Sequence, residues 1–166
     1  EDGWLKTGDV GFVDDDGYIR ITDRKRDFIK NSGGETISPA RVEGYLTLER
    51  EIAQAMVFGD RRPYLVAVLV PDADFAADYS PPDGPVGDFR GLAADPGFAK
   101  AIGAAVTRVN HALSPIERVR RFVVAAEPFT IANEQMTPTL KIKRHVIRDA
   151  YGAALDALYE TKDIAA

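Results

Sequence analysis

Cysteine is absent from the 166 residues of this chain. Without a thiol, the protein can form no disulfide, use no cysteine nucleophile and build no thiolate metal site. Histidine is scarce as well, since His111 and His145 are the two present and they lie far apart in the sequence. We expect each to be a partly exposed helix residue rather than a zinc ligand. The composition therefore argues against thiol chemistry and against a histidine-based metal centre.

An excess of positive charge is also missing. The chain has 21 Lys and Arg against 26 Asp and Glu, with a net charge of −5 and a pI near 5.1. Because nucleic-acid binding depends on a broad basic surface that neutralises phosphates, we expect no nucleic-acid partner. No apolar run approaches the roughly 18 residues of a membrane span, and no signal peptide is recognisable. These absences favour a cytoplasmic protein and leave peripheral membrane contact open.

What the chain does have is the composition of a globular domain. Hydrophobic residues make up 45% and charged residues 28%, and the length suits one domain, or one domain with a fragment of another. The chain starts at Glu1 rather than at a methionine. We therefore expect it to be cut from a longer protein.

Local patterns predict an alternation of strands and helices. A β-hairpin is expected from residues 10–22 around the turn "DDDG", and a short strand from Phe28. Ser38 followed by Pro39 is typical of a helix N-cap and first helical position. The apolar runs at 52–59 and 64–70 predict neighbouring strands, the second buried on both faces.

The second half of the chain continues this alternation. Residues 72–97 contain a Pro- and Gly-rich stretch and predict an irregular excursion with a helical turn around Phe75. The residues that then recur at helical spacing are Phe98, Ile102, Val106, Val109 and Leu113. A short helical turn is expected after Ser114, a strand from Arg121 and a final helix from about Arg144. The predicted fold class is therefore α/β (α+β), with a small mixed sheet covered by helices.

The stretch "TPTLKIKRH" at 137–145 places basic residues close together in an acidic chain. A solvated helix face is the ordinary explanation for such a run. Lys141 differs from the others because it precedes the helical pattern and lies between Leu140 and Ile142. It is therefore the first candidate for a functional side chain, whereas Lys143 and Arg144 are interpreted as surface charges or aids to phosphate binding.

Three segments match one family in order and spacing. "GWLKTGD" (3–9), "GYIRITDRKRDFIKNSGGETISPARVE" (17–43) and "TPTLKIKR" (137–144) resemble the last blocks of the adenylate-forming (AMP-binding) enzymes. This family includes acyl-CoA synthetases, luciferases and peptide synthetase adenylation domains, and the pattern is most similar to long-chain fatty acyl-CoA synthetases. Each block alone is common, but the three together are specific.

The resemblance implies a domain organisation. Residues 1–23 would be the end of a large N-terminal ATP- and acyl-binding domain, residues 24–26 the hinge, and residues 27–166 a mobile C-terminal lid domain. Arg26 would occupy the hinge position, where relatives carry Asp or Lys. Asp9 would accept hydrogen bonds from the ribose hydroxyls of ATP, and Arg24 would contact the ribose or a nearby phosphate.

The resemblance also implies two catalytic lysines. Lys141 would stabilise the negative charge that develops when a fatty carboxylate attacks the α-phosphate of ATP. It follows Thr139-Leu140, where many relatives have Ser-Gly. After rotation of the lid, Lys30 would approach the adenylate, and Gly33 and Gly34 would let the pantetheine arm of CoA pass. For Glu35, a contact to nucleotide or partner domain and a loop-stabilising role remain equal alternatives.

The implied function is that of the C-terminal domain of a long-chain fatty acid:CoA ligase, inactive alone. Its cofactors would be ATP, CoA and Mg²⁺, with the magnesium ligand in the N-terminal domain of the same enzyme, and fatty acid would be the substrate. Two alternatives stay open. The acceptor could be a carrier-protein thiol instead of CoA, or the chain could be a stand-alone, non-catalytic binding module.

Overall fold

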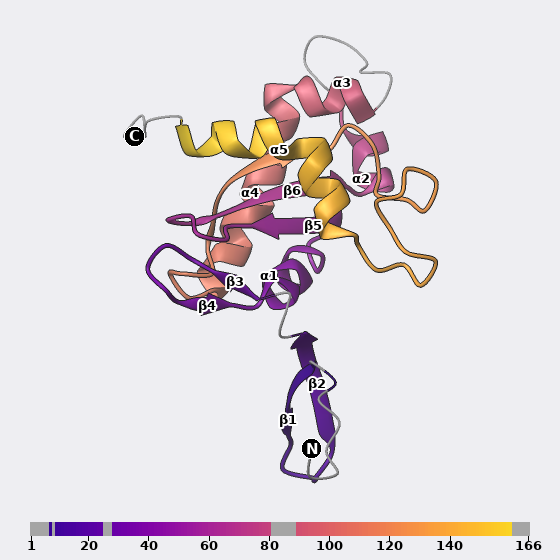
Figure 1. The fold of residues 1–166 in the computed structure, drawn as a ribbon. Coiled ribbons are helices and arrows are strands. Elements are labelled where there is room, and N and C mark those ends of the chain that lie inside the picture. The colour runs from indigo at the N-terminus through magenta and orange to yellow at the C-terminus, as the bar shows by residue number, and fades with distance from the viewer. Residues whose placement is uncertain (1–6, 8, 25–27, 81–88, 161–166) are drawn as a thin grey trace.

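The computed structural model describes residues 7, 9–24, 28–80 and 89–160 (Figure 1). In chain order the elements are β1 (Asp9–Val13), β2 (Ile19–Arg24), β3 (Ile29–Lys30), β4 (Thr36–Ile37), α1 (Pro39–Leu46), β5 (Ile52–Phe58), β6 (Leu65–Pro71), α2 (Ala73–Asp78), α3 (Phe89–Ala94), α4 (Pro96–Ala112), β7 (Val119–Val124) and α5 (Arg144–Glu160). Apart from β4 and α3, these are the strands and helices expected from the sequence.

The central sheet has the strand order β5-β6-β7. β5 runs antiparallel to β6, and β6 runs parallel to β7, so the sheet is mixed as predicted. The parallel pair needs a long crossover, which contains α4. Every residue of β6 is buried, because helices cover both faces of this strand.

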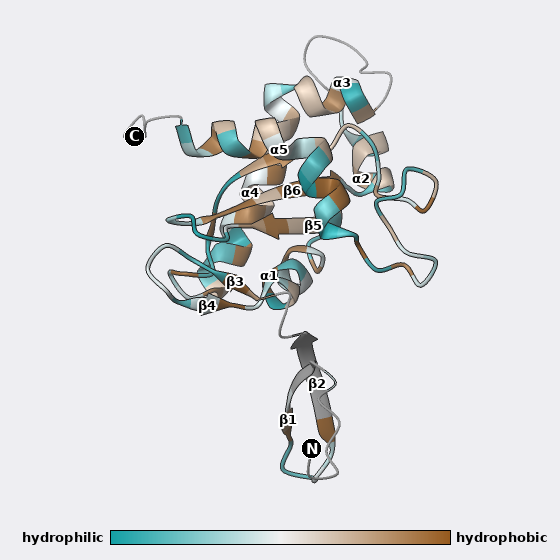
Figure 2. Cartoon of the chain, in the orientation of Figure 1, coloured by the Kyte–Doolittle hydropathy of each residue, from teal (hydrophilic) through white to brown (hydrophobic). Residues whose placement is uncertain are grey.

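Helices cover the two faces of the sheet unequally. The cluster on one face joins α1 and α4 to alternate strand residues that include Ala67 and Leu69. The cluster on the other face joins Ile147 and Leu155 of α5 to Val66 and Val68. In Figure 1, α5 lies in front of the sheet and α4 behind it, and Figure 2 shows the strands between them as hydrophobic. We call this arrangement of α5, the central sheet, and α1 with α4 the three-layer body.

The helix starts follow their sequence signals. The Ser38 side chain accepts from the Arg41 N–H at 3.3 Å, and Pro39 is the first residue of α1, as predicted. Asp95 caps α4 by accepting from the Phe98 N–H at 2.6 Å. This hydrogen bond, together with one from the Tyr79 hydroxyl, lowers the pKa of the Asp95 carboxyl.

The β1–β2 hairpin lies apart from the three-layer body in Figure 1. The strands are antiparallel, and the Asp14 side chain holds the connecting turn by accepting from the Tyr18 N–H at 2.9 Å. Large apolar side chains of the hairpin are exposed, with Tyr18 at 71% and Ile19 at 75%. The hairpin is therefore the one predicted from residues 10–22, and it displays an apolar surface.

The excursion at 72–97 is more regular than predicted. Phe75 lies in the short helix α2 as expected, but α3 is a second helix where the sequence predicted irregular chain. The physical reason is tertiary, since Leu92 of α3 is buried in the same core cluster as Phe98. Most of the Pro-rich stretch 79–88 lies outside the described residues. The turn predicted after Ser114 is present, and the Glu117 N–H donates to the Ser114 carbonyl at 3.0 Å.

Candidate functional site

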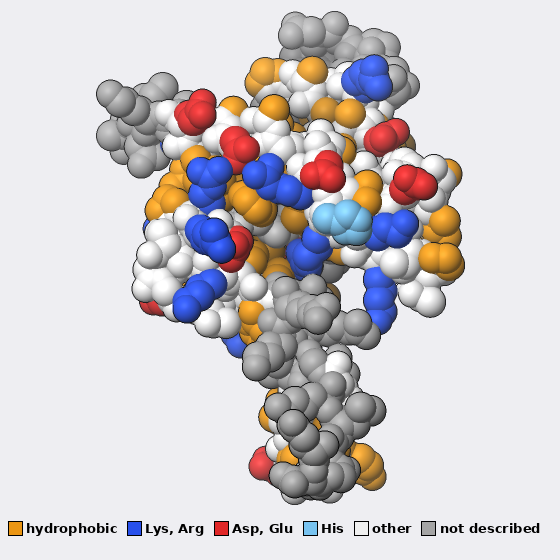
Figure 3. Space-filling model, viewed as in Figure 1, with side chains coloured by type: hydrophobic (Ala, Val, Ile, Leu, Met, Phe, Trp, Pro, Cys, Tyr) orange, Lys and Arg blue, Asp and Glu red, His pale blue; other side chains and the backbone are white. Residues whose placement is uncertain are grey.

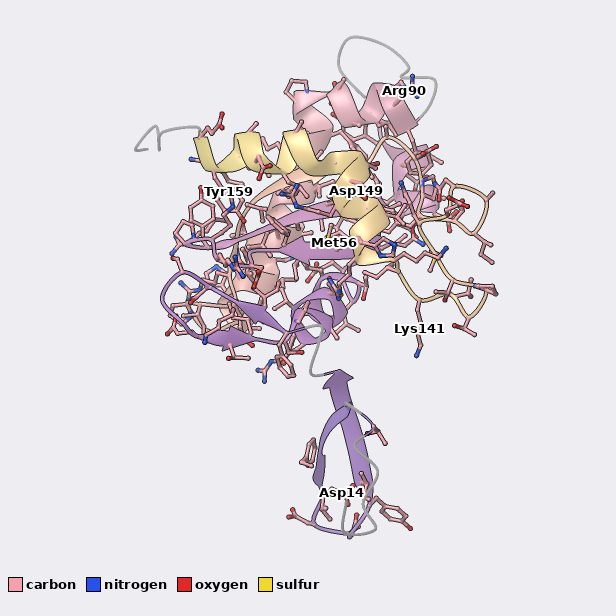
Figure 4. All side chains as sticks on the ribbon, in the orientation of Figure 1. Asp14, Met56, Arg90, Lys141, Asp149 and Tyr159 are labelled. Carbon is pink, nitrogen blue, oxygen red and sulfur yellow. The ribbon has the colours of Figure 1, made fainter. Side chains whose placement is uncertain are left out.

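Lys141 lies on a loop that is closed at its base. Met136 and Ile142 form an isolated antiparallel bridge, and the Thr137 N–H donates to the Lys141 carbonyl at 2.8 Å. In return, the Lys141 N–H donates to Thr137 Oγ1 at 3.1 Å. Figure 4 shows the Lys141 side chain pointing away from the three-layer body. A fixed backbone therefore presents an exposed ammonium group.

The residue before Lys141 has a backbone conformation that favours glycine. Leu140 has φ 58°, in the left-handed region. This conformation costs a residue with a side chain roughly 1–2 kcal/mol relative to the right-handed region. The backbone of Leu140 therefore takes an angle that glycine adopts readily. The Leu140 side chain is also 68% exposed, beside Lys141.

Arg144 corrects the expectation that it is a surface charge. Its Nη1 donates to Glu43 Oε1 and its Nη2 to Glu43 Oε2, both at 2.6 Å. The two side chains are 28% and 12% exposed. Sequence reasoning missed this pair, although the second and third blocks of the resemblance end on Glu43 and Arg144.

The second candidate lysine, Lys30, is exposed at the end of β3. Its backbone is fixed on both sides, because its N–H donates to Asp60 Oδ1 at 3.2 Å and its carbonyl accepts from the Arg61 N–H at 2.7 Å. A further hydrogen bond joins the same two segments, because the Ser32 N–H donates to the Arg62 carbonyl at 3.0 Å. The Lys30 loop is thereby attached to the turn between β5 and β6.

Glu35 stabilises its own loop. Its Oε2 accepts from Asn31 Nδ2 at 2.8 Å, and its N–H donates to Asn31 Oδ1 at 2.9 Å. Of the two roles left open by the sequence, the structure shows the loop-stabilising one. Gly33 and Gly34 lie between these partners, and Gly34 has φ 84°, which favours glycine. The nucleotide contact of Glu35 stays a prediction.

Two glycines of this region give opposite expectations for the same substitution. Gly34→Ala should lower the free energy of unfolding by about 1 kcal/mol or more, because alanine is strained at positive φ. Gly44→Ala should raise it by about 0.5–1 kcal/mol, because Gly44 lies in α1 with open space around it. Urea denaturation of both variants measures the two changes. A rise in the free energy of unfolding for Gly34→Ala would contradict the positive φ of the Gly34 loop, and a fall for Gly44→Ala would contradict the open helical position of Gly44.

The predicted ribose-binding residues lie opposite each other on the hairpin. Asp9 of β1 and Arg24 of β2 are register partners in the antiparallel pair. For both residues the structure describes the backbone alone. Arg26, the predicted hinge residue, lies outside the described residues. The hairpin therefore places Asp9 and Arg24 close together at the end that leads to the predicted hinge.

The predicted site residues do not gather in one place. Figure 1 shows the β3–β4 loop and the loop that precedes α5 on opposite sides of the three-layer body, with the hairpin separate from both. The structure thus groups the candidates into three surfaces, carrying Lys141, Lys30 with its loop, and the pair Asp9 and Arg24. Figure 3 shows Lys and Arg side chains spread over the face that carries α5, among fewer acidic ones.

A cavity of about 460 Å³ lies between β3, β5 and the start of α5. Arg144, His145 and Arg148 contribute to its wall. Two of these groups have partners inside the domain, since Arg144 pairs with Glu43 and the Arg148 guanidinium lies 4.4 Å from the centre of the Phe58 ring. Arg148 also approaches Asp156 at 3.3 Å. Internal pairing therefore accounts for these two arginines.

The resemblance places the magnesium ligand in the N-terminal domain of the same enzyme, outside this chain. Among residues 7, 9–24, 28–80 and 89–160, no three His, Asp or Glu side chains are grouped so that they could hold a metal ion.

Within the same part of the chain, no helix combines the length and the apolar character required to cross a bilayer.

Comparison with known proteins agrees with the sequence blocks. The family of AMP-binding enzyme C-terminal domains matches residues 26–163. Long-chain-fatty-acid–CoA ligase FadD15 of Mycobacterium tuberculosis is 37% identical over 163 residues, covering 95% of this chain and 27% of that protein. Human long-chain-fatty-acid–CoA ligase 1 is 34% identical over 164 residues, covering 97% of this chain and 24% of that protein.

A solved structure gives the same result for the fold. The A domain of carboxylic acid reductase from Segniliparus rugosus, in complex with AMP and a co-purified carboxylic acid, matches with a TM-score of 0.78 and 29% identity. The match covers 96% of this chain and 24% of that one. The chain therefore spans about a quarter of the length of these proteins. The resemblance drawn from the three blocks is confirmed, and the chain belongs to the family of AMP-binding enzyme C-terminal domains.

Proposed function

We propose that the chain is the C-terminal domain of an AMP-forming long-chain fatty acid:CoA ligase. In this proposal, Lys141 serves acyl-adenylate formation and the Lys30 loop serves thioester formation. The chain is 37% identical to a long-chain ligase over 95% of its own residues. The observation that carries the proposal is that Lys141 lies on a loop closed by hydrogen bonds, on the opposite side of the domain from the Lys30 loop. Two such surfaces on one domain suit two reaction steps that use different orientations of it.

In the first step, a carboxylate oxygen of the fatty acid attacks the α-phosphorus of ATP, and pyrophosphate leaves. Two anions must approach each other, so negative charge concentrates on oxygens of both. The exposed Lys141 ammonium would lie between them and stabilise the transition state electrostatically, without transferring a proton. The braced backbone of its loop supports this role, because a fixed charge needs little reorganisation during the reaction.

In the second step, the thiol of CoA attacks the carbonyl carbon of the acyl-adenylate, and AMP leaves. Rotation of the domain would remove Lys141 and bring Lys30, Gly33 and Gly34 to the reaction centre. The glycines leave room for the pantetheine arm beside the backbone. Glu35 would hold the loop through Asn31, and its contact with nucleotide belongs to this proposal as well.

The hairpin would belong to the large domain that precedes this one. Asp9 would accept from the ribose hydroxyls, and Arg24 would donate to the ribose or a phosphate, with the hinge at 24–26. The start of the family match at residue 26 supports this boundary, as do the exposed side chains of Tyr18 and Ile19, which suit packing against further protein. Magnesium, when bound by that domain, would neutralise charge on the phosphates.

The proposal is tested by comparing two proteins: the 166-residue chain and the longer protein that contains it. With ATP, Mg²⁺, palmitate and CoA, the longer protein should release pyrophosphate and form palmitoyl-CoA. The chain alone should release none, because the groups that hold triphosphate and acid are not among its residues. Turnover by the chain alone, or no thioester from the longer protein, would contradict the proposal.

A carrier-protein thiol is the second candidate acceptor. It is favoured by the match to the A-PCP didomain of carboxylic acid reductase from Segniliparus rugosus, with a TM-score of 0.76 and 28% identity, because that protein joins the matching domain directly to a carrier domain. The same assay distinguishes the two acceptors when CoA is replaced by a carrier protein that bears phosphopantetheine. Acyl transfer to the carrier protein in preference to CoA would favour this alternative.

A further inference from the structure

We infer that the ion pair between Glu43 and Arg144 is a positioning device for Lys141. The inference rests on the proposed role of Lys141 and adds two residues that act through it. Arg144 is the first residue of α5 and follows Lys141 by three positions. The pair thus lies where the Lys141 loop joins the rigid body of the domain.

The Lys141 loop has its own internal closure, but that closure does not determine where the loop lies. The bridge between Met136 and Ile142 joins the two sides of the loop to each other. The Lys143 N–H, which donates to the Gln135 carbonyl at 2.8 Å, belongs to this same closure. One attachment to the body lies before the lysine, where Gln54 Nε2 of β5 donates to Met136 Sδ at 3.4 Å. The other attachment that follows the lysine directly is Arg144. Together with the packing of Met136 and Ile142 against the core, the position of Arg144 therefore fixes where the Lys141 loop projects from the body.

The Glu43 carboxylate is held in place where it accepts from Arg144. It lies within α1, and its Oε1 also accepts from the Val57 N–H of β5 at 2.8 Å. One carboxylate thereby joins the start of α5 to a helix and to an edge strand of the central sheet. Both bonds to the guanidinium measure 2.6 Å, and this two-pronged geometry fixes angle as well as distance. A lysine ammonium at position 144 could keep the charge but not the paired geometry.

The same pair connects the two proposed reaction surfaces. α1 follows β4 almost directly, and β4 pairs with β3, which ends at Lys30. Glu43 therefore ties the loop that carries Lys141 to the segment that carries Lys30. This connection keeps the two lysines at a constant separation when the domain turns between its two orientations.

The test uses Arg144→Lys in the longer protein, with each half-reaction measured separately. Because a small displacement of a catalytic group has a large effect on rate, we expect kcat for acyl-adenylate formation to fall about 10- to 100-fold. The KM for ATP should stay within about twofold, since the lysine acts in the transition state. Thioester formation from supplied acyl-adenylate should also stay within about twofold.

Arg108→Lys is the matched control. Arg108 of α4 donates hydrogen bonds to the carboxylates of Glu49 and Glu51. The same substitution therefore removes comparable arginine–carboxylate hydrogen bonds elsewhere in the domain. This variant should leave adenylate formation unchanged. Glu43→Gln is a milder second variant, because its amide oxygen can still accept from Val57. It should lower the same half-reaction as Arg144→Lys, and the double variant should be no slower than the slower single one.

The outcomes separate this inference from the proposed function. The inference is overturned if both variants leave adenylate formation unchanged, if they lower both half-reactions equally, or if Arg108→Lys causes the same loss. Lys141→Ala serves as the reference in the same assay. If Lys141→Ala is impaired while Arg144→Lys and Glu43→Gln are not, the positioning role of the ion pair is wrong and the proposed function of Lys141 stands. If Lys141→Ala has full activity, both the proposed function of Lys141 and the positioning role of the ion pair are wrong.

Discussion

Replacing Lys141 with alanine in the longer protein is expected to slow acyl-adenylate formation by about two to four powers of ten. The substitution removes an ammonium group that we place between two anions, a loss of about 3 to 5 kcal/mol of transition-state stabilisation. Pyrophosphate release from ATP and palmitate measures this step. Thioester formation from supplied palmitoyl-adenylate should be largely retained, because the other orientation of the domain removes Lys141 from the reaction centre.

Lys143→Ala is the matched control for this prediction. Lys143 lies two residues from Lys141 and is only partly exposed, whereas Lys141 is exposed at the outer part of the loop. Removing this neighbouring charge should change adenylate formation by less than about tenfold. Equal losses in the two variants would indicate that a general positive potential is sufficient. Equal losses in both half-reactions of Lys141→Ala would indicate a misfolded domain instead of a missing catalytic charge.

The largest expected effect on stability is that of Phe98→Ala. The Phe98 side chain is fully buried in α4, and its ring centre lies 5.7 Å from that of Phe75 and 4.9 Å from that of Tyr79. Alanine would leave a cavity between α2, α4 and the sheet. We expect the free energy of unfolding to fall by about 3 to 5 kcal/mol, a large part of the roughly 5 to 15 kcal/mol of a typical domain.

Phe12→Ala provides the comparison, because Phe12 is 54% exposed on the β1–β2 hairpin. In the 166-residue chain this substitution should change the free energy of unfolding by less than about 0.5 kcal/mol. Urea denaturation of both variants, followed by far-UV circular dichroism, measures the difference. A loss below about 1 kcal/mol for Phe98→Ala would show that the packing of α4 against α2 is not part of the cooperative core.

The elements that were predicted well have strong local signals. Ser38 and Pro39 define the start of α1 because a hydroxyl cap and a proline suit the unpaired N–H groups there. α4 was visible from Phe98 onward because its buried residues recur at helical spacing. The hairpin followed from its Asp-Gly turn. In each case, residues within a few positions of one another carry the information.

The features that were missed depend on residues far apart in the chain. α3 became a helix because Leu92 reaches the core of other elements, and nothing in its own short sequence distinguishes it from loop. Arg144 was interpreted as a surface charge because its partner Glu43 is 101 positions away. Spacing within the basic stretch could not reveal a carboxylate on another helix.

The sequence by itself determined the family, most of the strands and helices, and the singling out of Lys141, because these depend on residue types at short and fixed spacings. Only the tertiary structure decided that Arg144 is paired, that Glu35 holds its own loop, and that the two candidate lysines lie on opposite sides of one domain. The reason is physical: charge pairing and the direction in which a loop projects depend on distances that arise when distant segments pack together.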